Sequence, residues 1–177
     1  MHPRINALVV MGVAGCGKSS VGQAIAKLTD AVFIEGDAFH PPANIAKMSA
    51  GIPLDDNDRA GWLVRLGEEL RAATRGGQRA VLTCSALRHA YRRQLRQSLP
   101  GLGFVYLELA RETAGERVAS RPDHFMPASL IDSQFAALEP PHVEPLTLVL
   151  DATLPVDQLS QEAEAWWKST DSIARPA

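Results

Sequence analysis

The feature that most constrains this chain is a loop motif near its N-terminus. Residues 12–19 read Gly-Val-Ala-Gly-Cys-Gly-Lys-Ser and fill every fixed position of the G-x-x-x-x-G-K-[ST] pattern. The motif follows the apolar run from Ala7 to Met11 and precedes a helical pattern, which is the strand–loop–helix context that this pattern requires. The sequence therefore predicts an α/β domain whose first buried strand delivers the loop to the start of a helix.

The chemistry of the motif favours a polyphosphate ligand. Glycines let backbone N–H groups turn inward around β- and γ-phosphates, and the helix start adds its positive dipole end. Lys18 brings a point charge, and the Ser19 hydroxyl can ligate Mg²⁺. We predict that the chain binds ATP with Mg²⁺ through Gly12, Val13, Ala14, Gly15, Cys16, Gly17, Lys18, Ser19 and Ser20.

Strand and helix patterns alternate along the rest of the chain. Predicted strands cover residues 5–11, 31–34, 80–84, 104–109 and 146–150. Predicted helices cover residues 19–28, 45–50, 56–74, 87–99, 111–120 and 156–167. The alternation predicts a three-layer αβα fold with a five-stranded parallel sheet, in one domain over residues 1–168. Residues 169–177 are predicted to be a frayed tail.

Composition excludes several classes of protein. The net charge of −2 gives no basic surface of the kind that binds nucleic acid. No apolar run approaches the length of a membrane span, and we expect no signal peptide before the first strand. Cys16 and Cys84 form neither a disulfide framework nor a metal motif, so we expect reduced thiols and a cytoplasmic protein.

Two carboxylates follow the second predicted strand. Ligands of open parallel sheets bind beyond the carboxyl ends of the strands, so Glu35 and Asp37 should meet the phosphate loop in one cleft. Asp37 is placed to orient an acceptor hydroxyl and take its proton, and Glu35 to hold Mg²⁺ through water. The alternative for both is a solvated acid in a turn. No apolar strand ends in a Walker B Asp, which favours a small-molecule kinase over a mechanical ATPase.

Further polar residues suit a hydroxyl-rich or anionic ligand. His40 and Lys47 lie in a proline-punctuated stretch, although His40 also fits an ordinary loop histidine. Arg117 and Arg121 share one helical face next to a predicted mobile lid over residues 118–130, where a lid would carry phosphate-clamping arginines. Pro155 follows the last strand and is placed beside the adenine base, unless its loop is an ordinary connection.

Beyond the loop, the chain resembles the gluconate kinases of the P-loop, shikimate-kinase-like group. The resemblance runs in order over most of the chain. Its blocks are the phosphate loop, Gly36-Asp37, His40-Pro41, Asn44, Lys47-Met48, residues 51–59, Trp62-Leu63, residues 84–87, Tyr91-Arg92, Arg117, Arg121, residues 124–127, Ser133-Gln134-Phe135 and Leu138-Glu139. The blocks H-P-x-x-N-x-x-K-M and P-L-x-D-x-D-R are much more specific than the phosphate loop alone.

The resemblance implies a P-loop kinase fold and ATP-dependent phosphorylation of the 6-hydroxyl of D-gluconate. It also implies roles for individual residues. Asp37 would be the base, Lys18 and Arg121 would act on the phosphates, and Arg117 would help bind the nucleotide. His40, Lys47, Arg59, Arg92 and His124 would contact the substrate. Members of the group are often homodimers. The chain departs from the group pattern at Glu35, where Asp is frequent, and at Gly61, where proline is usual.

Two alternatives to this activity stay open at the level of sequence. The first is a kinase for shikimate or another small hydroxy acid, since a carboxylate with arginines suits several polyol acids. The second is a slow ATP-hydrolysing switch or binding module, which would need a partner surface. Trp166 and Trp167 could supply that surface, although helical spacing favours packing of one of the two rings on the sheet.

Overall fold

A computed structural model of the chain describes residues 4–121 and 127–173. The strands are β1 (Ala7–Met11), β2 (Val32–Glu35), β3 (Ala80–Thr83), β4 (Leu102–Glu108) and β5 (Thr147–Asp151). The α-helices are α1 (Lys18–Thr29), α2 (Pro42–Ser49), α3 (Asp56–Ala73), α4 (His89–Ser98), α5 (Arg111–Ala119), α6 (Ala128–Ala137) and α7 (Val156–Ile173). Two short 3₁₀ turns, η1 (Gly36–Phe39) and η2 (Arg75–Gly77), complete the described elements.

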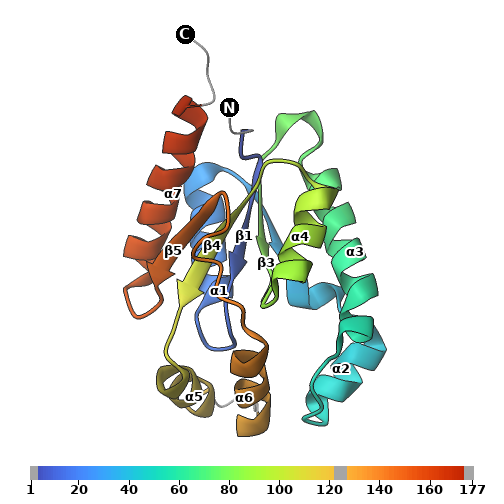
Figure 1. Cartoon of the computed structure of the whole chain (residues 1–177). Helices are drawn as coiled ribbons and strands as arrows, with labels where there is room; N and C mark the ends of the chain where they lie inside the picture. The colour runs from blue at the N-terminus through green and yellow to red at the C-terminus, as the bar shows by residue number, and fades with distance from the viewer. Residues whose placement is uncertain (1–3, 122–126, 174–177) are drawn as a thin grey trace.

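The five strands form one parallel sheet in the order β2-β3-β1-β4-β5. β1 lies in the middle, paired with β3 on one side and β4 on the other. The predicted five-stranded parallel sheet is therefore confirmed. Because all strands run the same way, their carboxyl ends meet at one edge, at the bottom of Figure 1.

Alternating side chains of the central strand feed two separate cores. Leu8 and Val10 point into a core shared with α1 and α7, whereas Val9 and Met11 point into a core shared with α3 and α4. α1 packs against α7, and α3 packs against α4, on opposite faces of the sheet (Figure 1). A sheet covered on both faces explains why its strands are almost continuously apolar.

Two elements differ from the sequence prediction. α6 was not predicted, and it begins directly after Pro127 and packs against α5. α7 continues through residues 169–173, which the sequence predicted as a frayed tail. Arg79 forms an ion pair with Asp171 in this last stretch and ties the helix to the strand-β3 side of the sheet.

Trp167, in the C-terminal helix α7, packs on the sheet. Trp167 is fully buried, and its Nε1–H donates to the backbone oxygen of Ile5 at 2.9 Å. The guanidinium of Arg79 covers the ring at 4.8 Å from its centre. The expectation that one of the two rings packs on the sheet is confirmed.

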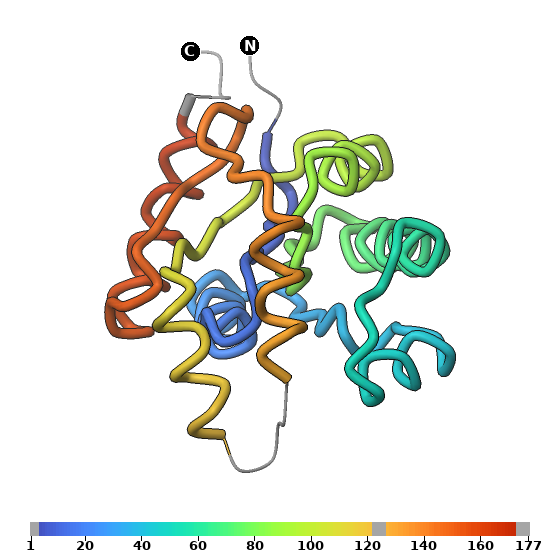
Figure 2. Tube along the Cα trace, turned by 60° about the horizontal axis from the view of Figure 1, so that its bottom comes forward, coloured from blue at the N-terminus to red at the C-terminus, as the bar shows by residue number. Residues whose placement is uncertain are grey.

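Three helices gather beyond the carboxyl ends of the strands. α5 and α6 lie side by side below β4 and β5, and α2 lies below α3 (Figures 1 and 2). The predicted lid over residues 118–130 includes residues 122–126, which lie outside the described residues, and its two ends belong to α5 and α6. Within residues 4–121 and 127–173, no helix has the length and apolar character to cross a membrane.

Candidate active site

A cleft of about 480 Å³ opens at the carboxyl edge of the sheet. It joins the phosphate loop to η1, α2, the start of α3, α5 and α6, which are far apart in the sequence. Its lining includes these predicted site residues: Ala14, Gly15, Gly17, Lys18, Ser19, Ser20, Glu35, Asp37, His40, Arg59 and Arg121. The structure thus brings the P-loop and the first predicted substrate-side residues together in one cavity.

The phosphate loop is shaped by its glycines and by Lys18. Gly17 precedes α1 with φ at 92°, a left-handed conformation that favours glycine. The ammonium group of Lys18 donates to the backbone oxygens of Gly12 at 3.0 Å and Val13 at 3.1 Å. Val13 and Cys16 are buried beneath the loop. The lysine therefore spans the loop with its positive charge at the mouth of an anion site.

The Glu35 carboxylate is fixed by hydrogen bonds at both of its oxygens. Ser19 donates its hydroxyl to Oε2 at 2.7 Å, and Thr83 donates to Oε1 at 2.6 Å. A hydroxyl and a carboxylate side by side next to the phosphate loop are the hard oxygen donors that suit Mg²⁺, which keeps most of its waters. The predicted pair Ser19 and Glu35 therefore fits a magnesium ion, while within the described residues no group of three His, Cys, Asp or Glu side chains could hold a metal.

Asp37 reaches the cleft because the backbone of Gly36 packs closely against the end of β3. A Cβ placed on Gly36 would lie 2.0 Å from the Thr83 backbone oxygen, so only glycine lets β2 end this close to β3. The Gly36 N–H donates to the Thr83 hydroxyl at 3.2 Å, and its oxygen accepts from Trp62 Nε1 at 2.9 Å. The Asp37 side chain, 76% exposed, extends into the cleft from this fixed turn.

Arg59 lines the opposite wall of the cleft. Its Nη1 donates to the Leu54 oxygen at 2.6 Å and to the Tyr91 hydroxyl at 3.3 Å, and its guanidinium lies 5.4 Å from the centre of the Tyr91 ring. Tyr91 in turn donates to Asp56. A guanidinium held this way keeps further N–H groups for an anionic or hydroxyl-bearing ligand.

Lys47 is held outside the cleft lining. Its ammonium group lies 2.7 Å from Asp58 Oδ2, and Asp58 also closes a reciprocal capping box with Asp55 at the start of α3. Lys47 therefore links α2 to the start of α3 through Asp58, the residue directly before Arg59. A contact of Lys47 with the acceptor stays a prediction.

Arg92, predicted to contact the substrate, is not among the residues that line the cleft. Its side chain is fully buried and bonds to the oxygens of Ala86 and Glu139, both at 2.7 Å, and to the Glu144 carboxylate. Burial by itself raises the pKa of Glu144, but hydrogen bonds from Arg92 and Arg96 outweigh it and lower that pKa to about 2. Arg92 therefore ties the loop after β3 to the loop before β5, and its donors are committed to these loops. The basic sequence pattern of α4 could not distinguish these two uses.

Two further predicted residues, Arg117 and Pro155, lie at the loop after β5. Arg117 donates to the oxygens of Gly15 at 3.2 Å and Ala152 at 3.0 Å, so it connects the phosphate loop to the loop after β5. Pro155 is exposed in that loop. Contact of either residue with the adenine base stays a prediction, and His124 lies outside the described residues.

Gln134 belongs to one of the sequence blocks shared with the gluconate kinases, but no role was predicted for it. Gln134 Oε1 accepts the backbone N–H of Ala14 at 2.7 Å, so α6 touches the phosphate loop directly. The missing signal was α6 itself. Asn44 was likewise quoted without a role, and it lies buried between His40 and the start of α3.

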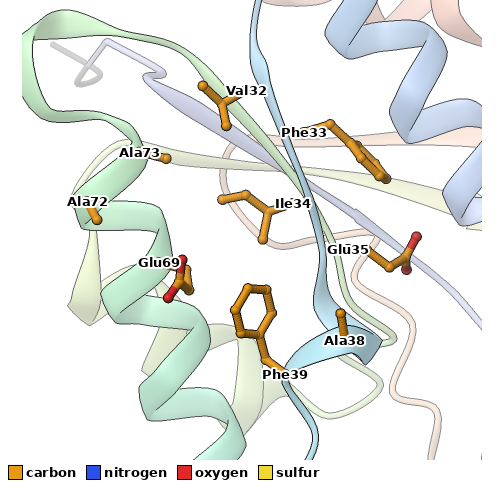
Figure 3. Close-up of a pocket in the computed structure, with 9 residues that line it drawn as sticks. All are labelled: Val32, Phe33, Ile34, Glu35, Ala38, Phe39, Glu69, Ala72 and Ala73. Atoms are coloured by element: carbon orange, nitrogen blue, oxygen red, sulfur yellow. The ribbon is translucent and has the colours of Figure 1, made fainter.

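A second hollow of about 530 Å³ lies between the edge strand β2 and α3 (Figure 3). Its lining is mostly apolar, with Ile34 and Phe39 at its centre. In Figure 3 the Glu35 carboxylate points away from these side chains, to the other side of β2. The carboxylate of Glu35 is therefore used on the cleft side, with Ser19 and Thr83, although the residue also lines the hollow.

Comparison with known proteins agrees with the geometry. A family model described as an AAA domain matches residues 8–141. A gluconokinase of Gluconobacter oxydans is 49% identical over 141 residues, covering 80% of this chain and 78% of that protein. The chain belongs to the gluconokinase family. A crystal structure of another gluconokinase, from Sinorhizobium meliloti, superimposes with a TM-score of 0.86 at 45% identity and 97% coverage of both chains. An unliganded sugar kinase from a Janibacter species gives a TM-score of 0.87 at 41% identity, covering 98% of this chain and all of that one. The fold and the family of kinases are thus established together.

Proposed function

We propose that this protein transfers the γ-phosphoryl group of ATP to the 6-hydroxyl of D-gluconate, giving 6-phospho-D-gluconate. One observation carries the proposal. Asp37 extends from the end of β2 into the same cleft as Lys18 and the Ser19–Glu35 pair, so an acceptor and a triphosphate can meet there. Membership of the gluconokinase family supplies the identity of the acceptor.

The residues divide the work of an in-line transfer between them. The backbone of the phosphate loop and Lys18 hold the β- and γ-phosphates, and Arg121 faces the same cavity from the end of α5. Ser19 with Glu35 would hold Mg²⁺, which when bound neutralises charge on the phosphates. Asp37 orients the acceptor hydroxyl and accepts its proton as the new P–O bond forms and the bond to ADP breaks.

The acceptor is bound from the other side of the cleft. Gluconate carries a carboxylate and several hydroxyls, and Arg59 offers free N–H groups at the start of α3. The apolar side chains of Met48, Leu54 and Trp62 close this part of the cavity. Arg59 would therefore anchor the carboxylate or the hydroxyls of a sugar acid in this part of the cavity.

An assay of ADP release tests the substrate. With Mg-ATP, we expect turnover with D-gluconate and little with shikimate, other sugar acids or nucleoside monophosphates. Turnover only with another acceptor would keep the kinase assignment but refute gluconate as the substrate. Release of ADP without any acceptor would favour a slow ATP-hydrolysing switch.

A variant of the base tests the mechanism. Asp37→Asn keeps the shape of the side chain but cannot accept the proton, so kcat should fall by about 10² to 10⁴ with the KM for ATP nearly unchanged. Near-normal kcat in this variant would refute the role of Asp37. The family resemblance also extends the proposal to a homodimer, which sedimentation of the purified protein would test. The two thiols, expected to be reduced, extend the proposal to a cytoplasmic protein.

A further inference from the structure

His40 is a buried, rigidly held ring in the cleft. It is 8% exposed and stacks on Trp62, with 4.0 Å between ring centres and 17° between ring planes. Trp62 is itself anchored by its hydrogen bond to the Gly36 oxygen. The imidazole therefore cannot turn freely, and its Nδ1 faces Asn44.

Asn44 determines which ring nitrogen of His40 carries the proton. Asn44 lies 2.9 Å from the backbone oxygen of Asp58, which only accepts hydrogen bonds, so the side-chain nitrogen Nδ2 must face it. The same Nδ2 lies 3.2 Å from His40 Nδ1 and can donate its second hydrogen there. Nδ1 is then an acceptor, and the proton of a neutral ring must sit on Nε2.

The protonated nitrogen faces the base. His40 Nε2 lies 3.7 Å from Asp37 Oδ1, slightly beyond hydrogen-bond distance, which is common in catalytic pairs before the substrate is bound. The charged groups around the ring are Asp37 and Arg59. Burial lowers the pKa of His40, Asp37 raises it and Arg59 lowers it, with burial the largest effect, and the net shift is downward. Burial thus favours the neutral ring.

We propose that His40 is a positioning residue whose Nε2–H, fixed in that tautomer by Asn44, directs the Asp37 carboxylate toward the acceptor hydroxyl. Asp37 is otherwise largely exposed and free to choose among rotamers. A fixed N–H donor at one of its oxygens leaves the other for the substrate. The inference rests on the proposed role of Asp37 and assigns His40 to the base and not to the sugar acid.

Nuclear magnetic resonance tests the tautomer directly. In ¹⁵N-labelled protein, long-range ¹H–¹⁵N correlations of the His40 ring show which nitrogen is protonated. We expect the Nε2–H form in the wild type near pH 7 and a mixture of both tautomers in Asn44→Leu. A dominant Nδ1–H form in the wild type would overturn the inference.

Kinetics test the consequence. His40→Phe keeps a ring on Trp62 but removes both nitrogens, so kcat should fall about 10- to 100-fold with the KM for gluconate within about threefold. His40→Gln places an N–H near the position of Nε2 and should recover most of kcat, whereas His40→Asn is too short to reach Asp37 and should resemble His40→Phe. His142→Gln, which changes a histidine outside the cleft, is the control and should keep kcat within about twofold.

The outcomes separate the two proposals. A raised KM for gluconate with unchanged kcat in His40→Phe would mean that His40 contacts the substrate, and equal losses in His40→Gln and His40→Phe would also refute the positioning role. Normal turnover of Asp37→Asn would instead refute the proposed base. Melting temperatures of all variants check folding, and the wild-type tautomer remains decisive if His40→Phe fails to fold.

Discussion

Replacing Glu144 by Gln should destabilise the protein without changing its chemistry. Glu144 has a side chain only 9% exposed and faces the fully buried Arg92, with Arg96 and His89 close by. Glu144→Gln keeps the shape of the side chain and removes the charge that balances these cations. A buried cation left without its partner is strongly destabilising.

The size of the effect follows from the pKa of Glu144. Folding lowers it from 4.5 to about 2, a shift that corresponds to about 3 kcal/mol of stability at neutral pH. Because the pKa in the folded state is depressed, this stability is present above pH 4.5 and is lost as the pH falls toward 2. The difference between wild type and variant should therefore be constant from pH 5 to 8, by the same linkage, and shrink in acid.

Urea denaturation at several pH values measures this difference. The control is Glu69→Gln, which breaks an exposed pair with Arg65 one turn away and should cost less than about 0.5 kcal/mol. Under stabilising conditions Glu144→Gln should keep the KM for gluconate, since Arg92 does not reach the cleft. A loss below about 1 kcal/mol at pH 7, or a difference that persists in acid, would refute the reasoning about this pair. A raised KM for gluconate would instead indicate that Arg92 contacts the substrate.

Two further substitutions test how the cleft is held. Gly36→Ala places a methyl group against the Thr83 backbone oxygen, which cannot move aside, so we expect a lower melting temperature and a loss of kcat as Asp37 is displaced; an unchanged kcat would show that the end of β2 can shift. Gln134→Leu removes the acceptor for the Ala14 N–H and should raise the KM for ATP by several-fold while sparing the KM for gluconate, and steady-state kinetics with each substrate varied will show whether it does.

The catalytic end of the site was predictable because it depends on strand ends. Lys18, Ser19, Glu35 and Asp37 each lie at or just beyond the carboxyl end of a strand, and a parallel sheet brings such ends together at one edge. The central position of β1 and the two-faced burial of the sheet follow from the same apolar strand patterns.

The rest of the site depends on packing between elements that the sequence does not order. The buried contact of Asn44 with His40 and the start of α3 forms only once α2 has docked on α3, so spacing alone could not reveal it. In the sequence, Arg92 belongs to a basic helix face. Its partner Glu144 lies in a loop more than 50 residues later and is brought beside it only by folding. α6 was not predicted because no side chain caps its start, and it has neither an acidic residue in its first turn nor a basic residue in its last turn.

The cleft is built from two sets of elements that meet at Asp37. In the proposed function, the triphosphate side comes from the phosphate loop, α5 and α6, and the acceptor side from η1, α2 and the start of α3. Arg117 joins the triphosphate side to the loop after β5. We therefore expect substitutions at Met48, Leu54 or Arg59 to alter which acid is phosphorylated while the triphosphate side keeps its geometry. A chain organised in this way can acquire a new acceptor through a few changes in one continuous segment, residues 40–62, which makes that segment the natural target for redesigning its specificity.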